Sequence, residues 1–432
     1  MFLLKEQLVR TVPKTTLSMA VMYYGTDLTD RIIEFNRSSA TCRIELKDYS
    51  VYNEAGSIVG GISGGVKQLN LDIISGKAPD ILLCNDLPIE KYASKGLLED
   101  LYPYLDADPE LSPEDIVPAV RNALETNGHL YRFATVFRIE TLVGRKSKAG
   151  PNMGRTLDEY MNCAYSMPKG TSPFYLNFKS DMLRQLLIYS MDSYVNWDTG
   201  ELRFESEDFI KLLEYCSAFP SEQEYSEKNW CEMIADGELN FYCYTACGFE
   251  DLQIVSKLFG EEIVFKGYPS STGSGSILVP ETTYAISSTC MDKQAAWEFL
   301  RTFLTEEYQW DSKLTADGYM QAFPTNKKAL EKLAAYSASD SFILPSNGKT
   351  FERERYDVVY YPLTILTRAA TSSEVEQILA LIDSAKGVRA YNEPIMKIVE
   401  DEAAAYFEGV ISASEAARLI QSRAALYTNE QK

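Results

Sequence analysis

Two patterns of hydrophobic positions alternate along this chain. One is a short continuous apolar run, and the other is a longer segment in which apolar residues recur at helical spacing. The clearest short run covers residues 81–84, between a turn at Pro79 and a return of polarity at Asn85 and Asp86. Such a run is typical of a strand buried on both faces of a parallel sheet. Ligands of open α/β sheets bind at the carboxyl ends of the strands, so the pattern predicts a site at Asn85 and Asp86.

Helical signals flank this strand. The amphipathic run before it stops at Gly76, and Pro88 and Gly96 suit the two ends of the helix after it. Further strands are predicted at 17–23, 44–46, 238–244 and 263–268, an edge segment at 97–104, and helices at 116–124, 156–165, 181–194 and 209–219. Helix caps are predicted at Asp27 or Thr29, at Asp292, and at the pairs Ser373 with Glu376 and Ser412 with Glu415. The resulting fold class is α/β, with a helical C-terminal region.

Two segments are extended and contain no helical pattern. Residues 128–145 form the longer one, and residues 284–287 form a short strand. Strands that pass from one domain into another have this pattern. Since 432 residues exceed what one compact core holds, the chain is predicted to have two domains or more, joined at these crossings.

Composition narrows the class of protein. The chain is 45% hydrophobic and 24% charged, as soluble globular proteins are, and no apolar run is long enough to span a membrane. Its 62 acidic and 42 basic residues give a formal charge of -20, which disfavours nucleic acids and anionic membranes as partners. The N-terminus has no signal-peptide pattern, so the protein is cytoplasmic or has lost a signal or an upstream domain.

The sequence offers little for catalysis. The single histidine, His129, follows a predicted Asn-Gly turn and is interpreted as an exposed structural residue. Without further histidines or phosphate-binding glycine motifs, no catalytic residue, metal site or cofactor is predicted. The segment 61–65 has the letters of a hydrolase nucleophile elbow but is interpreted as a glycine-rich loop, and the acidic pair Glu99 with Asp100 is interpreted as solvated surface.

Aromatic residues and thiols complete the inventory. The chain has 28 tyrosines, whose rings stack on sugars while their hydroxyls form hydrogen bonds. The informative ones end predicted strands, as Tyr24 and Tyr244 do. The eight cysteines form no CxxC pair, and most are predicted to be buried thiols.

Six motifs follow one another along the chain. They are Gly-Lys-Ala-Pro-Asp-Ile-Leu at 76–82, Tyr-Ala-Ser-Lys-Gly-Leu-Leu-Glu-Asp-Leu at 92–101, Asp-Gly-Glu-Leu-Asn-Phe-Tyr at 236–242, Ala-Ala-Trp-Glu-Phe-Leu at 295–300, Phe-Pro-Thr-Asn-Lys-Lys-Ala-Leu at 323–330, and the ending from Ala-Tyr-Phe-Glu-Gly to Ile-Gln-Ser-Arg. In this order they resemble the motifs of family 1 extracellular solute-binding proteins, the maltose-binding-protein-like carbohydrate receptors of ABC importers. The resemblance covers roughly residues 15–428.

This resemblance implies a two-lobed, periplasmic-binding-protein-like α/β fold of type II, with a hinge of extended crossings. Lobe 1 would comprise 15–137 and 285–325, and lobe 2 would comprise 138–284 and 326–432. Residues 1–14 would be an N-terminal extension or the remnant of a removed segment. The ligand would lie in the cleft between the lobes, where hinge closure excludes water.

The resemblance also places candidate ligand-binding residues. Asn85 and Asp86 correspond to a sugar-contacting loop of the first lobe, and their side chains can bond hydroxyls. In the second lobe, Cys247 falls nearest the place of a stacking aromatic, and Phe249 is close by. Further candidates end strands or project from the hinge: Tyr24, Tyr244, Tyr268 and Arg138.

The function that follows is capture of a sugar or oligosaccharide and its delivery to ABC transporter permease subunits, without chemistry. A monomer is expected, located extracellularly and anchored as a lipoprotein in the full-length protein. Two alternatives stay open. One is a glycoside hydrolase or lyase acting on a sugar polymer, and the other is a sugar-sensing domain of a larger surface protein.

Overall fold

The computed structural model describes most of the chain. The described residues are 14–53, 62–84, 87–154, 156, 158–159, 161–162, 178–196, 199–222, 228–268, 275–315, 322–343, 350–352, 357–360, 363–388 and 393–430. The chain divides into two compact units. The first comprises Met1–Asp115, Leu124–Thr135 and Glu281–Gln309, and the second comprises Ile116–Ala123, Val136–Pro280 and Trp310–Lys432.

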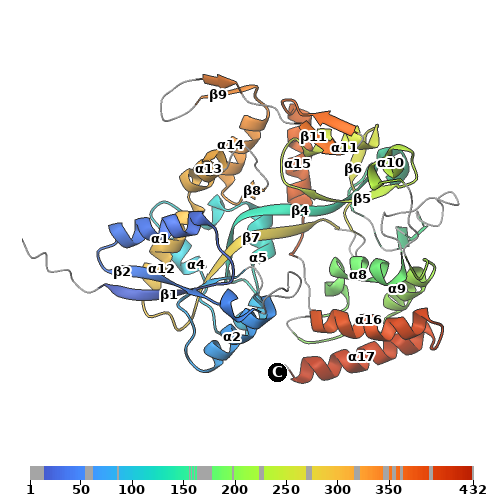
Figure 1. The fold of residues 1–432 in the computed structure, drawn as a ribbon, viewed down its shortest axis with the longest axis horizontal. Helices are drawn as coiled ribbons and strands as arrows, with labels where there is room; N and C mark the ends of the chain where they lie inside the picture. The colour runs from blue at the N-terminus through green and yellow to red at the C-terminus, as the bar shows by residue number, and fades with distance from the viewer. Residues whose placement is uncertain are drawn as a thin grey trace, which may run out of the picture. The chain divides into compact units, whose positions relative to one another are not determined.

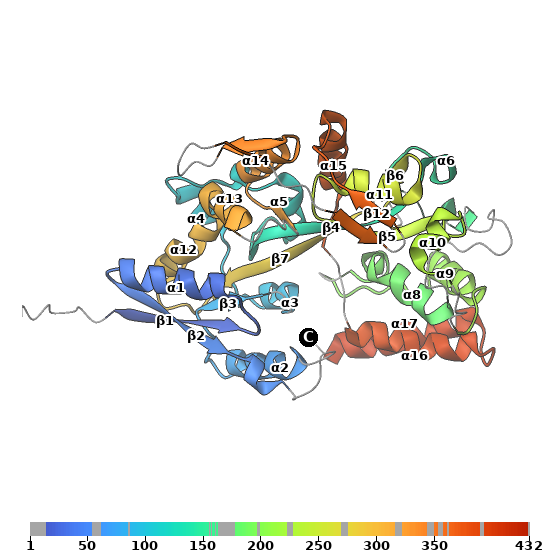
Figure 2. The same ribbon diagram turned by 45° about the horizontal axis from the view of Figure 1, so that its top comes forward.

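The first unit is built on parallel strands, as the apolar runs predict. Strands β1 (Thr15–Val21), β2 (Cys42–Asp48) and β3 (Ile81–Leu83) follow the order β2-β1-β3, and β1 is parallel to both neighbours. The end of β7 (Ile277–Ile286) pairs antiparallel with β3. Helices α1 (Thr26–Ser38) and α2 (Ile62–Ile74) lie on opposite faces of β1 and β2 (Figure 1, Figure 2).

Shorter helices complete this unit. They are η1 (Ser50–Tyr52), α3 (Ile89–Ser94), α4 (Tyr102–Ala107), η2 (Pro113–Asp115), α12 (Lys293–Leu300), η4 (Arg301–Leu304) and the start of α13 (Glu306–Thr315). A buried cluster between β1, β3 and α3 includes Ala20, Tyr49, Leu82 and Tyr92. The carboxyl ends of the three parallel strands therefore share one edge above a packed core.

The second unit is organised around β4 (Phe133–Arg145), whose first three residues belong to the first unit. Strands β5 (Phe241–Ala246), β6 (Ile263–Phe265) and β8 (Phe323–Pro324) pair antiparallel with β4. Strand β7 also belongs to both units, since they divide between Pro280 and Glu281. The two extended segments predicted from the sequence are therefore confirmed as strands β4 and β7.

Helices form most of the rest of the second unit, as predicted for the C-terminal region. They are α5 (Pro118–Leu124), α6 (Lys146–Ala149), α8 (Lys179–Ile188), η3 (Met191–Ser193), α9 (Glu207–Ser217), α10 (Trp230–Ala235), α11 (Asp251–Phe259), α14 (Lys327–Ser337), α15 (Ser372–Ser384), α16 (Glu393–Phe407) and α17 (Ala413–Glu430). Two antiparallel pairs are separate: β9 (Ser341–Ile343) with β10 (Thr350–Glu352), and β11 (Asp357–Tyr360) with β12 (Leu363–Leu366). A large apolar core joins α8, α9, α16 and α17, which lie together in Figure 1.

The motif at residues 76–82 has a structural explanation. Gly76 follows α2 with a φ of +74°. This conformation is unfavourable for any residue that has a side chain, and glycine adopts it readily. The buried Asp80 accepts hydrogen bonds through Oδ2 from the Ser18 amide and hydroxyl, both at 2.8 Å, and through Oδ1 from the Met291 amide at 3.0 Å. Asp80 thereby ties β1 to the turn that follows β7.

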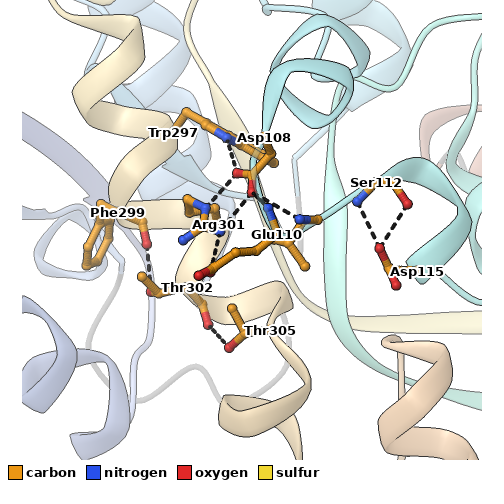
Figure 3. Close-up of polar contacts among 10 residues, drawn as sticks. Asp108, Glu110, Ser112, Asp115, Trp297, Phe299, Arg301, Thr302 and Thr305 are labelled. Atoms are coloured by element: carbon orange, nitrogen blue, oxygen red, sulfur yellow. Dashed lines mark hydrogen bonds and ion pairs between the residues drawn. The ribbon is translucent and has the colours of Figure 1, made fainter.

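The motif at residues 295–300 is structural as well (Figure 3). The Asp108 side chain, only 1% exposed, accepts hydrogen bonds from Trp297 Nε1 at 3.0 Å and from Arg301 Nε at 2.6 Å and Nη2 at 2.8 Å. Arg301 also pairs with Glu110 at 2.9 Å. The bidentate pair and the indole fix α12 and η4 against the loop that follows α4.

The structure also corrects several local predictions. The segment 97–104 makes a single bridge, Leu98 with Ser287, and then enters α4 at Tyr102. Helix α1 begins at Thr26 after Gly25, so neither Asp27 nor Thr29 is its cap. The capping box of α15 is Thr371 with Glu374, not Ser373 with Glu376.

Other local predictions are confirmed or cannot be compared. The Asp292 side chain caps α12 by accepting a hydrogen bond from the Ala295 amide, and the Ser412 hydroxyl accepts one from the Glu415 amide. Strand β5 extends to Ala246, two residues beyond the predicted end. The predicted helix at 156–165 lies largely outside the described residues.

Candidate functional site

The first candidate surface is the carboxyl edge of the parallel strands in the first unit. Strands β1 and β2 end in register at Val21 and Asp48, and tyrosines follow both. Tyr23 is 60% exposed, Tyr24 is 44% exposed, and Tyr52 of η1 is 52% exposed. Large aromatic side chains so exposed at a strand edge are a candidate surface for a ligand with apolar faces and hydroxyl groups.

Hydrogen bonds beneath this edge hold its backbone in place. The buried Tyr49 donates its amide hydrogen to Val21 O at 2.8 Å and its hydroxyl hydrogen to Asp72 Oδ2 at 2.6 Å. Lys47 Nζ lies 2.5 Å from the same oxygen, and Gln68 donates to Asp72 Oδ1 at 3.0 Å. The hydrogen bond from Lys47, followed by that from Tyr49, lowers the pKa of Asp72 to about 2.

Replacing Asp72 with asparagine should lower the free energy of unfolding near pH 7 by about 1 to 2 kcal/mol, after allowance for solvent screening of the exposed Lys47. The folded-state pKa lies below that of the unfolded chain, so the stabilisation is present above roughly pH 4 and is lost as the pH falls towards 2. Urea unfolding of both proteins at several pH values checks this. The exposed Asp106→Asn is the control, and a difference independent of pH would contradict the prediction.

The glycine-rich segment serves close packing at this edge. A Cβ on Gly65 would lie 2.6 Å from Tyr49 O and 2.7 Å from Met22 Sδ, and one on Gly64 would overlap the Tyr52 carbonyl. Asn53 Oδ1 accepts the Gly65 amide hydrogen bond at 2.8 Å. These glycines therefore let α2 approach the 49–53 segment, which contains η1.

Asn85 and Asp86, the candidates that follow β3 in the sequence, lie outside the described residues. The residues on either side of them are anchored. The buried Cys84 donates its amide hydrogen to Thr283 O at 2.7 Å, and Leu87 donates to Cys84 O at 3.0 Å. Burial raises the pKa of the Cys84 thiol to about 12, so this cysteine is a packing residue.

The second candidate surface is one face of β5 in the second unit. Tyr242 and Tyr244 are two residues apart, so both lie on this face, and both are half-buried. The ring of Trp230, the first residue of α10, stacks on Tyr242 with centroids 4.5 Å apart and an angle of 3°. Tyr360 of β11 contacts Trp230 edge to face at 5.2 Å. Four half-buried aromatic rings thus form one cluster.

The opposite face of β5 carries smaller side chains beyond the buried Phe241. Cys243 and Thr245 are exposed there, and Cys243 Sγ lies 3.8 Å from Gln185 Oε1. Gln185 in turn donates to Asp181 Oδ2 at 2.6 Å. Burial raises the pKa of Asp181. This face offers a thiol, a hydroxyl and an amide, which hydrogen-bond a polar ligand but do not stack on it.

The remaining candidates of the second unit occupy different environments. Phe249 is fully buried and contacts Phe323 edge to face at 5.7 Å, which makes it a core residue in this structure. Tyr268 is also buried, and its ring stacks on Tyr189. Arg138 is half-buried on β4, and Tyr244 is the one candidate that belongs to the aromatic cluster.

The sequence argument missed Trp230, Tyr242 and Tyr360. Two signals pointed to the first two. Tyr242 stands two residues before Tyr244, on the same face of a strand. Trp230 follows Asn229, which forms a capping box with Glu232 and thus places the indole at the start of α10. No local pattern marked Tyr360.

Residues considered for chemistry have structural partners. His129 is exposed, as predicted, and its Nδ1 lies 2.8 Å from Asp100 Oδ2, while Glu99 pairs with Lys293 at 2.6 Å. Within the described ranges, no group of three or more His, Cys, Asp or Glu side chains is arranged to hold a metal ion. Nor does any described helix combine the length and apolar character needed to cross a membrane.

The thiols mostly follow the prediction. Seven of the eight cysteines lie among the described residues, and none of those seven is in a disulfide. Five are buried, whereas Cys243 is exposed and Cys247 is partly exposed. The prediction of buried thiols is therefore confirmed for most of the described cysteines.

Comparisons with known proteins identify the fold. No protein-family profile matches the sequence, and no curated protein matches it. Solved structures do match. The sugar-binding protein MalE of Xanthomonas citri is 14% identical, with a TM-score of 0.59 over 96% of this chain and 98% of that one.

Two further structures match over a similar length. A family 1 extracellular solute-binding protein of Alicyclobacillus acidocaldarius is 14% identical, with a TM-score of 0.56 over 96% of this chain and 99% of that one. A cyclic α-maltosyl-1,6-maltose binding protein of Arthrobacter globiformis is 14% identical, with a TM-score of 0.55 over 97% and 100%. The chain therefore has the mixed α/β, periplasmic-binding-protein-type fold of these proteins, and the fold predicted from the motifs is confirmed.

Proposed function

We propose that this chain is an extracellular solute-binding protein that captures a sugar or oligosaccharide and delivers it, chemically unchanged, to an ABC importer. The observation that carries the proposal is the match in fold along nearly the whole chain to sugar-binding proteins. The exposed tyrosines at the strand edge of the first unit and the aromatic cluster on β5 support it, since aromatic rings stack on the apolar faces of sugars.

We assign one ligand-contacting surface to each lobe, with the lobes as 15–137 plus 285–325 and 138–284 plus 326–432. In the first, Tyr24, Asn85 and Asp86 are the proposed contacts. In the second, Tyr244 and Arg138 keep this role, and Trp230 joins them because its indole forms part of the cluster with Tyr242. Tyr268 and Phe249 are less suited, since both are buried.

The permease subunits of the importer are the proposed partners, and a lipid anchor on the full-length protein is the proposed attachment to the membrane. Both rest on the resemblance to solute-binding proteins of ABC importers. Co-purification of the full-length protein with its permease, in the presence and absence of sugar, tests the partnership. Recovery of the protein with the permease supports the proposal, and its absence under both conditions counts against it.

Titration calorimetry against a panel of linear and cyclic maltooligosaccharides and monosaccharides tests the binding function. A receptor binds at least one sugar with saturable heat and returns it intact, as chromatography of the mixture after prolonged incubation shows. Release of reducing sugar or of an unsaturated product would favour the hydrolase or lyase alternative. No binding across the panel would overturn the proposal that the ligand is a sugar.

Asp86→Ala is expected to weaken binding of the sugar found in that panel about tenfold, the effect of losing one hydrogen bond from a charged group. The melting temperature should change no more than for a surface substitution. Calorimetry and thermal unfolding of the two proteins measure both effects. An unchanged dissociation constant would remove Asp86 from the proposed site.

A further inference from the structure

The start of α11 contains a buried carboxylate that binds the end of β5 and the loop after it. Asp251 is 5% exposed, and its side chain accepts three hydrogen bonds. Tyr244 donates its hydroxyl hydrogen to Oδ1 at 2.6 Å, and the amides of Cys247 and Gly248 donate to Oδ2 at 2.6 Å and 2.7 Å. One side chain therefore fixes a tyrosine of the aromatic cluster and two residues of the adjoining loop.

The same arrangement favours a carboxylate. A carboxylate accepts hydrogen bonds through both oxygens and has no proton of its own to place. An amide in its position has one oxygen for three donors. Its NH₂ group would either face the two backbone amides, which cannot accept, or donate to the Tyr244 hydroxyl and reverse that hydrogen bond. Burial alone favours the neutral, protonated form of a carboxyl group, whereas the three short hydrogen bonds favour the ionised form.

We propose that Asp251 is a positioning residue for ligand binding, because its carboxylate holds Tyr244 and the loop at Cys247 and Gly248 in the arrangement that contacts the sugar. The inference rests on the proposed function and deepens it, since it adds a residue that does not touch the ligand. Asp251 acts through Tyr244 and through backbone geometry, and its protonation state controls both.

Protonation of Asp251 weakens this arrangement. Burial raises the pKa of its carboxyl to about 6, although the hydrogen bonds from Tyr244, Cys247 and Gly248 lower it. The neutral acid must place its own hydrogen, so at least one of the three contacts reverses or breaks. Ligand affinity should therefore be constant above about pH 7 and should fall as the pH drops through 6.

Ionisable groups around Asp251 come from β5, from the loop before α11 and from the elements packed against α11. Those nearest to it are Tyr244 on β5, Cys247 in the loop, the adjacent Glu250, and Tyr360 on β11. Helix α10 packs against α11 and carries Cys231 and Glu232, and Asp236 directly follows its last residue. Glu232 accepts a hydrogen bond from the Asn229 amide, and Asp236 pairs with Lys228. Helix α15 contributes Glu374, which pairs with Arg368, while β6 and β12 have no ionisable side chain.

The test measures the dissociation constant of the wild type, Asp251→Asn and Tyr244→Phe between about pH 5 and pH 8, using the sugar selected from the panel. Asp251→Asn is expected to bind about tenfold more weakly near pH 8, as loss of one hydrogen bond to a charged group implies. The wild type should approach the variant near pH 5, because its Asp251 is then protonated. Tyr244→Phe keeps the backbone bonds, so it should bind only about threefold more weakly and retain the pH dependence.

Asp108→Asn is the matched control, since it also alters a buried carboxylate with several donors, but in the other unit. Its affinity and pH profile should match those of the wild type even though it is less stable. A structural defect alone would lower the stability of both asparagine variants and change neither profile. Amide hydrogen exchange at Cys247 and Gly248 should be faster in Asp251→Asn than in the wild type.

Three outcomes decide the matter. Equal affinities of the wild type and Asp251→Asn across the pH range would overturn the inference and leave the proposed function intact. Failure of the wild type to bind any sugar would overturn the proposed function and the inference with it. If Asp251→Asn does not fold, the wild-type profile decides, since a flat profile between about pH 5 and pH 8 contradicts the inference.

Discussion

Replacing Asp108 with alanine is expected to lower the free energy of unfolding by about 3 to 5 kcal/mol, the cost of removing one partner of a buried ion pair. Arg301 would keep Glu110 but lose both bonds to Asp108, and Trp297 Nε1 would lose its acceptor. The amides of Glu110 and Leu111 also donate to Asp108 Oδ1, both at 3.0 Å. Several donors, the buried Trp297 indole among them, therefore lose an acceptor at once.

Urea unfolding followed by circular dichroism measures the loss, and hydrogen exchange locates it. The reduced protection should concentrate in the first unit, around α4, α12 and η4. Asp106→Ala is the matched control, because this residue is exposed on α4, two residues before Asp108, and should change stability by less than about 0.5 kcal/mol. A loss below about 1 kcal/mol for Asp108→Ala would show that this network contributes little to the fold.

The Asp108 network also explains why the fold could be predicted from the sequence. Trp297 lies in one of the motifs that carried the resemblance, and Asp80 lies in another; each holds a strand, helix or turn in place through buried hydrogen bonds. Asn326 in a third motif caps α14 by accepting the Ala329 amide hydrogen bond at 3.1 Å. Residues of this kind determine how elements join, so they predict the fold and carry no information about a ligand.

Strands and caps with strong local signals were predicted for the same reason. The run that became β3 is apolar at every position and is bounded by a proline and by polar residues, and it is buried throughout. Asp292 directly precedes an amphipathic run, and it caps α12. Here local chemistry and tertiary packing favour the same structure.

Predictions were wrong where two local signals competed. Thr371 and Ser373 each stand three residues before a glutamate, and the helix begins at the earlier pair, where Glu374 also binds Arg368 at 2.7 Å. At 97–104, the apolar residues followed by a loop rich in Asp and Pro indicated an edge segment. The Asp100 carboxylate instead accepts the amide hydrogens of Tyr102 and Leu130, which places the start of α4 there.

Candidate ligand-contacting residues are harder to predict, because their exposure depends on which face of a strand or loop is covered. Tyr24 and Phe249 are both aromatic and both lie beyond the end of a strand, yet one is exposed and the other is fully buried. The difference comes from Phe323, which is distant in sequence and contacts the ring of Phe249. Contacts of this range have no local signature.

Phe249→Ala should lower the free energy of unfolding by about 3 to 5 kcal/mol, because it leaves a cavity beside Phe323. Phe249→Leu fills most of that space and should cost roughly 1.5 kcal/mol. If Phe249 is a core residue, the leucine variant binds sugar with the wild-type dissociation constant. A stacking residue would behave differently, since leucine cannot replace an aromatic face and the affinity would fall.

Tyr24→Leu is the matched comparison and should give the opposite pattern. Its ring is 44% exposed, so stability should change by less than about 0.5 kcal/mol, whereas sugar affinity should fall about tenfold through loss of a stacking face. Unfolding and calorimetry of both leucine variants separate the two roles. A ring buried against Phe323 can influence a ligand only through the packing it supports, so a loss of affinity should come with a loss of stability. Reduced affinity in Phe249→Leu with unchanged stability would therefore show that Phe249 contacts the ligand.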